Sequence, residues 1–142
     1  MPPIYVYLKK DGARYNPGTV TGKGQSVSGI WLESAGKDLG VPIPSHIADK
    51  LRGRTFNRFD DFRAALWGEI GKDPNLINQF NEGNEELLRK ERSPYTVDSE
   101  QSGGRKVFEI HHVKEIQHGG AVYNIDNLRI VTPKNHIRIH KK

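Results

Sequence analysis

The sequence contains no cysteine. This excludes disulfide bonds and thiolate metal sites, so any metal ion must be bound by histidine, aspartate or glutamate. No apolar run approaches the roughly 18 residues that a membrane-spanning helix requires. The N-terminus also lacks the basic and then apolar regions of a signal peptide. We therefore expect neither a membrane segment nor a cleaved leader in this chain.

The chain has 142 residues, of which 35% are hydrophobic. This length suits one globular domain with a real core and is short for two. The hydrophobic content is too high for a disordered chain. A single domain over residues 1–142 is the prediction.

Positive charge gathers at the two ends of the chain. Residues 1–24 hold four lysines and arginines against one acidic residue, and residues 105–142 hold eight against three. The middle, residues 25–104, holds ten against thirteen. If the ends meet in space, they form one basic surface that suits the phosphates of a nucleic acid.

The middle of the chain is expected to be helical. The clearest segment is 59–70, where Phe62, Ala65 and Leu66 follow the i, i+3, i+4 spacing of one helix face, and Gly71 is expected to end it. Three shorter helices are expected over 46–51 with Ser45 as N-cap, over 74–80 with Pro74 in the first turn, and over 85–92.

The last third predicts a strand, a loop, a second strand and a helix. Residues 106–111 show an alternation of side-chain types that is typical of a strand. A polar linker over 96–104 precedes them. Residues 128–131 form the second strand. Thr132 then has the residue type of an N-cap, and Pro133 suits the first helical position. At the other end of the chain, Ile4–Leu8 predicts a short strand or an extended arm.

Five of the six histidines lie in the last 32 residues. His136 and His140 are four residues apart on the predicted helix, so both imidazoles lie on one face about 6 Å apart along the axis. His111 and His112 are adjacent on a predicted strand, where neighbouring side chains point to opposite sides. One of this pair can complete a metal site with His136 and His140. The spacing leaves open which one.

Three neutral imidazoles around a small divalent ion leave a coordination position open, which favours catalysis over a purely structural site. Such an ion neutralises the charge of a scissile phosphate. The remaining histidine of the pair can take a proton from water near neutral pH. Arg14 and Arg105 can supply fixed positive charge to the phosphate.

Each of these features also has a simpler interpretation. A histidine pair on a basic C-terminal helix can be surface residues that interact with the helix dipole. His46 and His118 are interpreted as structural or surface residues. Trp31 and Trp67 are interpreted as core residues rather than as platforms for base stacking.

Several motifs together resemble the cytotoxic DNase domain of E-group colicins and S-type pyocins. The C-terminal motifs are 103–112, 119–120, 126–129, 132–134 and 136–140, and matching segments upstream run from Arg14 to Arg63. The resemblance implies an α/β (α+β) fold in which a helical scaffold supports a C-terminal ββα-metal motif (HNH, His-Me finger) over residues 103–142. Residues 1–13 would form an N-terminal arm or linker.

The resemblance also implies a role for each candidate site residue. The ligands of one divalent metal ion, Zn, Ni or Mg, would be His111, His136 and His140. The general base would be His112, and Asn127 would brace the loop of the motif. The residues beside the scissile phosphate would be Arg14, Arg105 and Glu109, with Lys106 and Lys134 along the DNA backbone.

Members of this family are silenced by a small acidic immunity protein that binds beside the catalytic cleft. The matching stretch is 81–102, where the resemblance places Arg92, Ser93 and Tyr95 at the central contacts. Tyr95 is a candidate buried anchor. Four glutamates in this stretch depart from colicin patterns and leave open which immunity protein binds: Glu82, Glu85, Glu86 and Glu91.

The predicted function is therefore that of a bacteriocin nuclease that cleaves double-stranded DNA without strong sequence preference. The resemblance implies a toxin released by its producer that acts in the cytoplasm of the target cell. Receptor-binding and translocation domains would belong to the full-length toxin, since a methionine directly before Pro2-Pro3 suggests an excised domain. Two alternatives stay open: a housekeeping or phage HNH endonuclease, and a non-catalytic DNA-binding module with a structural metal.

Overall fold

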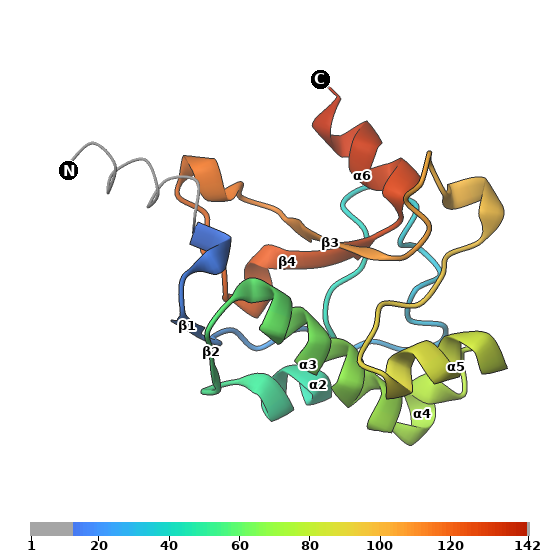
Figure 1. Ribbon diagram of the computed structural model, residues 1–142, viewed down its shortest axis with the longest axis horizontal. Helices are drawn as coiled ribbons and strands as arrows, with labels where there is room; N and C mark the ends of the chain where they lie inside the picture. The colour runs from blue at the N-terminus through green and yellow to red at the C-terminus, as the bar shows by residue number, and fades with distance from the viewer. Residues whose placement is uncertain (1–12, 142) are drawn as a thin grey trace.

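A computed structural model describes residues 13–141 (Figure 1). The arm expected around Ile4–Leu8 lies outside these residues. The α-helices are α2 (Ser45–Leu51), α3 (Phe59–Lys72), α4 (Pro74–Ile77), α5 (Glu82–Arg89) and α6 (Pro133–His140). The strands are β1 (Gly18–Thr19), β2 (Thr55–Phe56), β3 (Glu109–His112) and β4 (Leu128–Val131). Short 3-10 helices are η1 (Ala13–Tyr15), η2 (Asp98–Glu100), η3 (Ile116–His118) and η4 (Ile125–Asn127).

Helix α3 is the centre of the helical scaffold and packs against α2, α4 and α5. Asp60 and Asp61 lie in its first turn, where the helix dipole favours negative charge. The prediction that Gly71 ends this helix is wrong, because the helix continues to Lys72. Gly71 is instead a close-approach position: a Cβ there would lie 3.1 Å from the Cβ of Leu88 on α5.

The shorter helices exist where they were predicted, but their boundaries differ. Ser45 is the first residue of α2 rather than its cap, since Pro44 takes the N-cap position without a side-chain hydrogen bond. Helix α4 ends at Ile77 and not at Phe80. Helix α5 begins earlier than expected, because the Asn81 side chain accepts a hydrogen bond from the Asn84 N–H at 2.8 Å and caps it there.

Strands β3 and β4 form an antiparallel hairpin in which Glu109 pairs with Val131 and His112 with Leu128. Strand β4 and the capped helix α6 agree with the sequence prediction. Strand β3 begins three residues later than predicted. Figure 1 shows the helices α2 to α5 on one side of this hairpin and α6 on the other.

The residues before β3 form hydrogen bonds with an earlier segment instead of with β4. The Thr96 N–H donates to the Lys106 carbonyl at 3.1 Å, and the Phe108 N–H donates to the Pro94 carbonyl at 3.0 Å. Residues 96–104 are therefore not a free linker: Thr96 is buried and η2 lies within the stretch. This pairing attaches the segment around Tyr95 directly to the strand that carries two histidines.

The hydrophobic core lies between α3 and the hairpin. Trp31 and Trp67 are both buried, with ring centroids 6.0 Å apart, as expected for core residues. Leu128 and Ile130 of β4 are also fully buried. Among the described residues, none of the helices is long and apolar enough to span a bilayer.

The N-terminal segment lies against the loop that precedes β4. The Thr21 N–H donates to the Tyr123 carbonyl at 3.1 Å, and the Tyr123 hydroxyl donates to the Asn16 carbonyl at 2.8 Å. The Asp126 carboxylate accepts hydrogen bonds from the N–H groups of Lys23 and Gly24. These contacts bring the beginning of the described chain next to its C-terminal third.

Candidate active site

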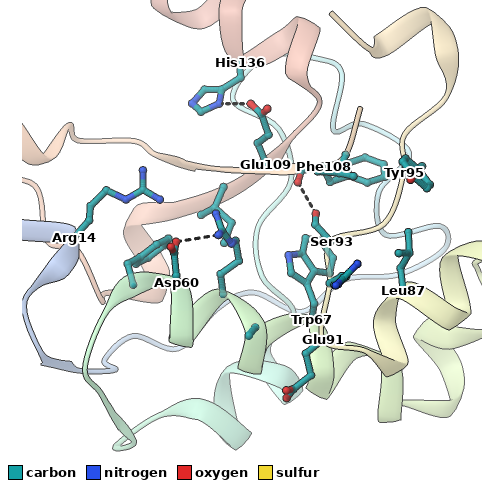
Figure 2. Close-up of a pocket in the computed structure, with 16 residues that line it drawn as sticks. Arg14, Asp60, Trp67, Leu87, Glu91, Ser93, Tyr95, Phe108, Glu109 and His136 are labelled. Atoms are coloured by element: carbon teal, nitrogen blue, oxygen red, sulfur yellow. Dashed lines mark hydrogen bonds and ion pairs between the residues drawn. The ribbon is translucent and has the colours of Figure 1, made fainter. Parts of the chain in front are cut away.

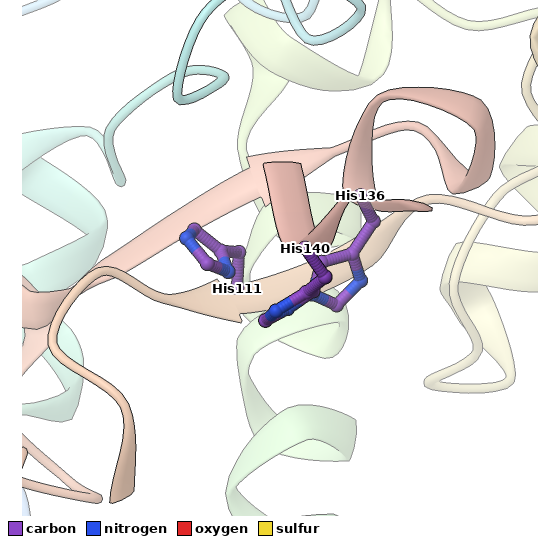
Figure 3. Close-up of side chains that lie close together, drawn as sticks. All are labelled: His111, His136 and His140. Carbon is purple, nitrogen blue, oxygen red and sulfur yellow. The ribbon is translucent and has the colours of Figure 1, made fainter. Parts of the chain in front are cut away.

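Three imidazoles converge where β3 meets α6. His111 comes from the strand, and His136 and His140 come from successive turns of the helix (Figure 3). Candidate ligand nitrogens of the three rings all lie within 4.8 Å of one another. Helix α6 is held in place at its start, since the Thr132 hydroxyl accepts a hydrogen bond from the Asn135 N–H at 3.1 Å. The donor set fits one divalent ion that prefers nitrogen ligands.

The buried member of this cluster is a neutral imidazole at pH 7. His111 is only 3% exposed. Burial lowers its pKa to about 4, and the neighbouring His136 and His140 lower it in the same direction. A neutral imidazole offers the lone pair that a metal ion requires.

Glu109 connects the cluster to Arg105. The Arg105 Nε donates to Glu109 Oε2 at 2.9 Å, and Glu109 Oε1 lies 2.9 Å from His136 Nδ1. Burial raises the pKa of the Glu109 carboxyl, but hydrogen bonds from Arg105 and His136 outweigh it and bring the pKa to about 2. An ionised carboxylate only accepts hydrogen bonds, so His136 Nδ1 carries the proton and Nε2 is left to bind a metal.

His112 lies on the opposite side of β3 from His111. Its Nε2 is 3.1 Å from the Val122 carbonyl. A carbonyl can only accept, so Nε2 carries the proton and Nδ1 keeps a lone pair. Burial lowers the pKa of His112, the Val122 carbonyl partly offsets this, and the charge of Arg14 lowers it further. The ring is therefore neutral at pH 7 and able to accept a proton.

Arg14 lies on η1, outside the C-terminal motif, yet it lines the same cavity as the histidines. This cavity of about 350 Å³ is bounded by Arg14, His111, His112, His136 and His140. The Arg14 Cζ is 5.1 Å from the centre of the Phe59 ring. The guanidinium of Arg14 and four imidazoles therefore line one solvent-accessible cavity.

Asn127 holds the loop between β3 and β4 together. Its Oδ1 accepts from the Lys114 N–H at 2.8 Å, and its Nδ2 donates to the carbonyls of Lys114 and Ala121 at 3.1 and 3.0 Å. The amide side chain therefore connects both ends of the loop that follows the two histidines. These hydrogen bonds support the prediction that Asn127 braces this loop.

The remaining basic candidates lie further out. Lys106 precedes β3, Lys134 is in the first turn of α6, and both are exposed. Neither is among the residues that line the two cavities described in this subsection. His46 lies elsewhere on the surface with its Nε2 3.0 Å from Asp73, and His118 is exposed, as expected for both.

A second cavity of about 650 Å³ connects the histidine site to the segment around Tyr95 (Figure 2). Glu109, His136 and Arg14 line one part of it, and Arg92, Ser93 and Tyr95 line another. The candidate partner-binding residues are thus next to the candidate catalytic residues in space as well as in sequence.

The segment from Arg92 to Tyr95 has a fixed backbone. The Ser93 hydroxyl donates to the Phe108 carbonyl at 2.5 Å. The Asn84 side chain accepts from the Tyr95 N–H at 2.9 Å and donates to the Tyr95 carbonyl at 3.1 Å. The Tyr95 side chain is 52% exposed. Main-chain contacts therefore hold the segment while the aromatic ring stays accessible.

Sequence reasoning missed three residues that shape the site. Phe59 was expected only as the start of a helix, Val122 acts through its carbonyl, and Asp126 holds the N-terminal segment. Every residue has a backbone carbonyl, so the residue type at 122 does not reveal this hydrogen bond. The Asp126–Gly24 contact joins residues 102 positions apart, which no local pattern records.

Comparison with known proteins identifies close relatives. The family model described as "Colicin/Pyocin-S2, DNase domain" matches residues 18–142. The chain is 53% identical over 125 residues to Colicin-E8 of Escherichia coli, which covers 88% of this chain and 61% of that protein. It is 52% identical over 139 residues to Pyocin-S1 of Pseudomonas aeruginosa, which covers 98% of this chain and 22% of that protein.

Two solved structures with the same fold are complexes with immunity proteins. The mutant nuclease domain of pyocin S8 with its cognate immunity protein matches with a TM-score of 0.85 and 50% identity, over 87% of this chain and 98% of that one. The pyocin AP41 DNase–immunity complex matches with a TM-score of 0.86 and 48% identity, over 89% and 98%. The mixed helical and antiparallel architecture described above is therefore shared with pyocin nuclease domains.

Proposed function

Because the chain belongs to the colicin and pyocin DNase-domain family, we propose that it is the cytotoxic nuclease domain of a bacteriocin. It hydrolyses DNA phosphodiester bonds and kills bacterial competitors. The observation that carries this proposal is that the four histidines of the hairpin and α6 divide into a group of three and a single imidazole. Three converge on a point that suits a metal ion, while His112 faces the other side of the strand beside Arg14.

The residues that would hold the metal ion are His111, His136 and His140. An ion bound there supplies positive charge to the scissile phosphate and the leaving oxygen. Three nitrogen donors suit zinc or nickel better than magnesium, which prefers oxygen. Residues 103–142 would thus be the nuclease motif.

The protein's own side chains perform the remaining steps. His112 accepts the proton of the attacking water at Nδ1, since its Nε2 is occupied by the Val122 carbonyl. Arg14 and Arg105 stabilise the negative charge that builds up on the phosphate. Glu109 orients both Arg105 and His136, and Asn127 keeps the loop after His112 closed.

Double-stranded DNA is the proposed substrate. The contacts available to it are cationic: Arg14, Arg105, Lys106 and Lys134 are all exposed or line the cavity. Contacts to phosphate carry no sequence information, so cleavage with little sequence preference is expected. Binding should weaken as salt rises.

A small acidic immunity protein is the proposed inhibitor, with residues 81–102 as its binding site. Arg92 offers positive charge, and Tyr95 offers an exposed aromatic ring on a fixed backbone. The pyocin S8 and pyocin AP41 structures are complexes with immunity proteins. The chain spans about three fifths of Colicin-E8 and about a fifth of Pyocin-S1. We propose that receptor-binding and translocation domains complete the toxin, which is released by its producer and acts in the target cytoplasm.

A plasmid nicking assay tests the enzyme activity. Purified protein is stripped with a chelator, reloaded with zinc, nickel or magnesium, and incubated with supercoiled DNA. We expect nicked or linear products with at least one metal and none with chelator or with His140→Ala. Intact supercoiled DNA under every metal condition would contradict the proposal and favour a non-catalytic module. A structural metal site alone, however, gives no reason for the neutral imidazole of His112 beside Arg14.

A further inference from the structure

Phe59 lies between two of the side chains to which catalysis is assigned above. Phe59 is the first residue of α3 and is only 1% exposed. The His112 ring centroid is 5.0 Å from the Phe59 centroid, and the Arg14 Cζ is 5.1 Å from it. A single buried aromatic ring therefore contacts both the candidate base and the candidate phosphate-binding arginine.

The two candidate catalytic arginines are held in different ways. Arg105 is paired with the Glu109 carboxylate. Within residues 13–141, the Arg14 side chain forms no ion pair and no hydrogen bond, and the Phe59 ring is the group in contact with its guanidinium. A carboxylate neutralises the charge that a phosphate needs, whereas an aromatic face attracts a cation and leaves its N–H donors free. An aromatic support thus suits an arginine that must meet a phosphate.

Phe59 is itself held in one position. Its ring centroid lies 5.3 Å from that of Phe62 and 6.0 Å from that of Tyr123. The Tyr123 hydroxyl donates to the Asn16 carbonyl, two residues after Arg14, and the preceding residue, Val122, accepts from His112. The same cluster therefore positions the backbone beside Arg14 and the proton on His112.

We propose that Phe59 is a positioning residue that fixes the Arg14 guanidinium relative to the His112 imidazole, so that one phosphate can meet both. This inference rests on the proposed nuclease function. Phe59 does not contact the reacting atoms; it acts through Arg14 and His112. The side chain required at this position is an aromatic ring and not merely an apolar group of similar size.

The test compares Phe59→Leu with Ile70→Ala in the 142-residue chain. Both changes remove fully buried apolar atoms from α3, but Ile70 lies about three helical turns after Phe59. We expect Phe59→Leu to lower kcat for plasmid cleavage by about 10-fold with little change in KM, because a misplaced catalytic group slows the chemical step. Ile70→Ala should also lower the melting temperature but leave kcat within about twofold of the wild type.

Two further measurements separate positioning from a general loss of structure. When Phe59→Leu is added to the Arg14→Ala variant, kcat should fall by markedly less than 10-fold, because the two changes remove one shared interaction. In nuclear magnetic resonance spectra of the metal-free protein, the side-chain protons of Arg14 should lose an upfield ring-current shift in Phe59→Leu and keep it in Ile70→Ala.

Equal losses of kcat in Phe59→Leu and Ile70→Ala would overturn the proposal, as would full additivity with Arg14→Ala. An Arg14 shift that does not change in Phe59→Leu would also overturn it. If the wild-type protein fails to cleave DNA with any metal, the nuclease function fails instead. The spectroscopic comparison still decides whether Phe59 fixes Arg14, because it requires no activity.

Discussion

The cavity of Figure 2 joins two regions that are built differently. Around Glu109 and His136, polar side chains hold one another: the carboxylate accepts from Arg105 and from His136. Around Ser93 and Tyr95, the contacts involve the main chain, through the Phe108 carbonyl and the Asn84 amide. Side chains are fixed in the first region, whereas the backbone is fixed in the second.

This difference agrees with the two proposed roles. Catalysis requires functional atoms to be held close to their working positions, which the pairing of Glu109 with Arg105 and His136 provides. Binding to a protein partner requires an accessible side chain whose loss of freedom on binding is small, which a rigid backbone with an exposed aromatic ring provides. Four variants test whether the two regions are as separable as this comparison implies.

The largest effect is expected for His112→Ala. Loss of a general base typically costs on the order of 10²–10⁴ in rate, so cleavage should fall by that factor. Metal affinity measured by titration calorimetry should stay unchanged, because His112 is not one of the three histidines of the metal-ligand cluster. His140→Ala serves as the control that lowers metal affinity as well. Equal metal loss in both variants would show that the base assignment is wrong.

Glu109→Gln should have the next largest effect. An amide keeps the shape of the side chain but removes the charge that holds Arg105 and His136. Groups that orient metal ligands typically contribute about 10–100-fold to metal affinity or activity. We expect a loss in that range by calorimetry and cleavage kinetics, with Glu86→Gln on the exposed face of α5 as the control. Wild-type behaviour of Glu109→Gln would remove the distinction between the two regions.

Tyr95→Ala should act on the other region alone. Removing an aromatic anchor from an interface commonly costs about 2 kcal/mol or more, roughly 30-fold in Kd. The binding of a co-purifying small acidic immunity protein should weaken by that amount, while DNA cleavage stays near normal. Tyr15→Ala removes a similarly exposed tyrosine that lies on η1, outside residues 81–102, and should leave partner binding unchanged. Equal affinity of Tyr95→Ala and wild type would place the inhibitor elsewhere.

The smallest effect is expected for a substitution that relieves backbone strain, and it concerns the free energy of unfolding. Glu91 and Asp38 are the two non-glycine residues with positive φ among the described residues, at 60° and 48°. Glycine relieves this strain but adds freedom to the unfolded chain, so Glu91→Gly should raise the free energy of unfolding by only about 0.5 kcal/mol. Asp38→Gly, which lies against α6, is the matched variant. Urea unfolding measures both, and destabilisation by Glu91→Gly would show that its side-chain contact at Gly68 outweighs the strain.

Much of the C-terminal third could be predicted from local pattern. The strand predicted over 128–131 matches β4, and Thr132-Pro133 placed the start of α6, because helix capping depends on residues that are neighbours in sequence. The boundaries that failed depend on contacts between segments. Strand β3 starts late because Lys106 and Phe108 bond to an earlier segment, and α3 passes through Gly71 because α5 packs against it.

The sequence by itself determined that two imidazoles on α6 face one way and that one of two adjacent histidines can join them, because helices and strands have fixed periods. Only the tertiary structure decided which one. The hairpin packs so that His111 faces α6 and His112 lies on Phe59. It also decided that Arg14 reaches this site at all, since the contacts of Thr21 and Asp126 that bring it there join parts of the chain about a hundred residues apart.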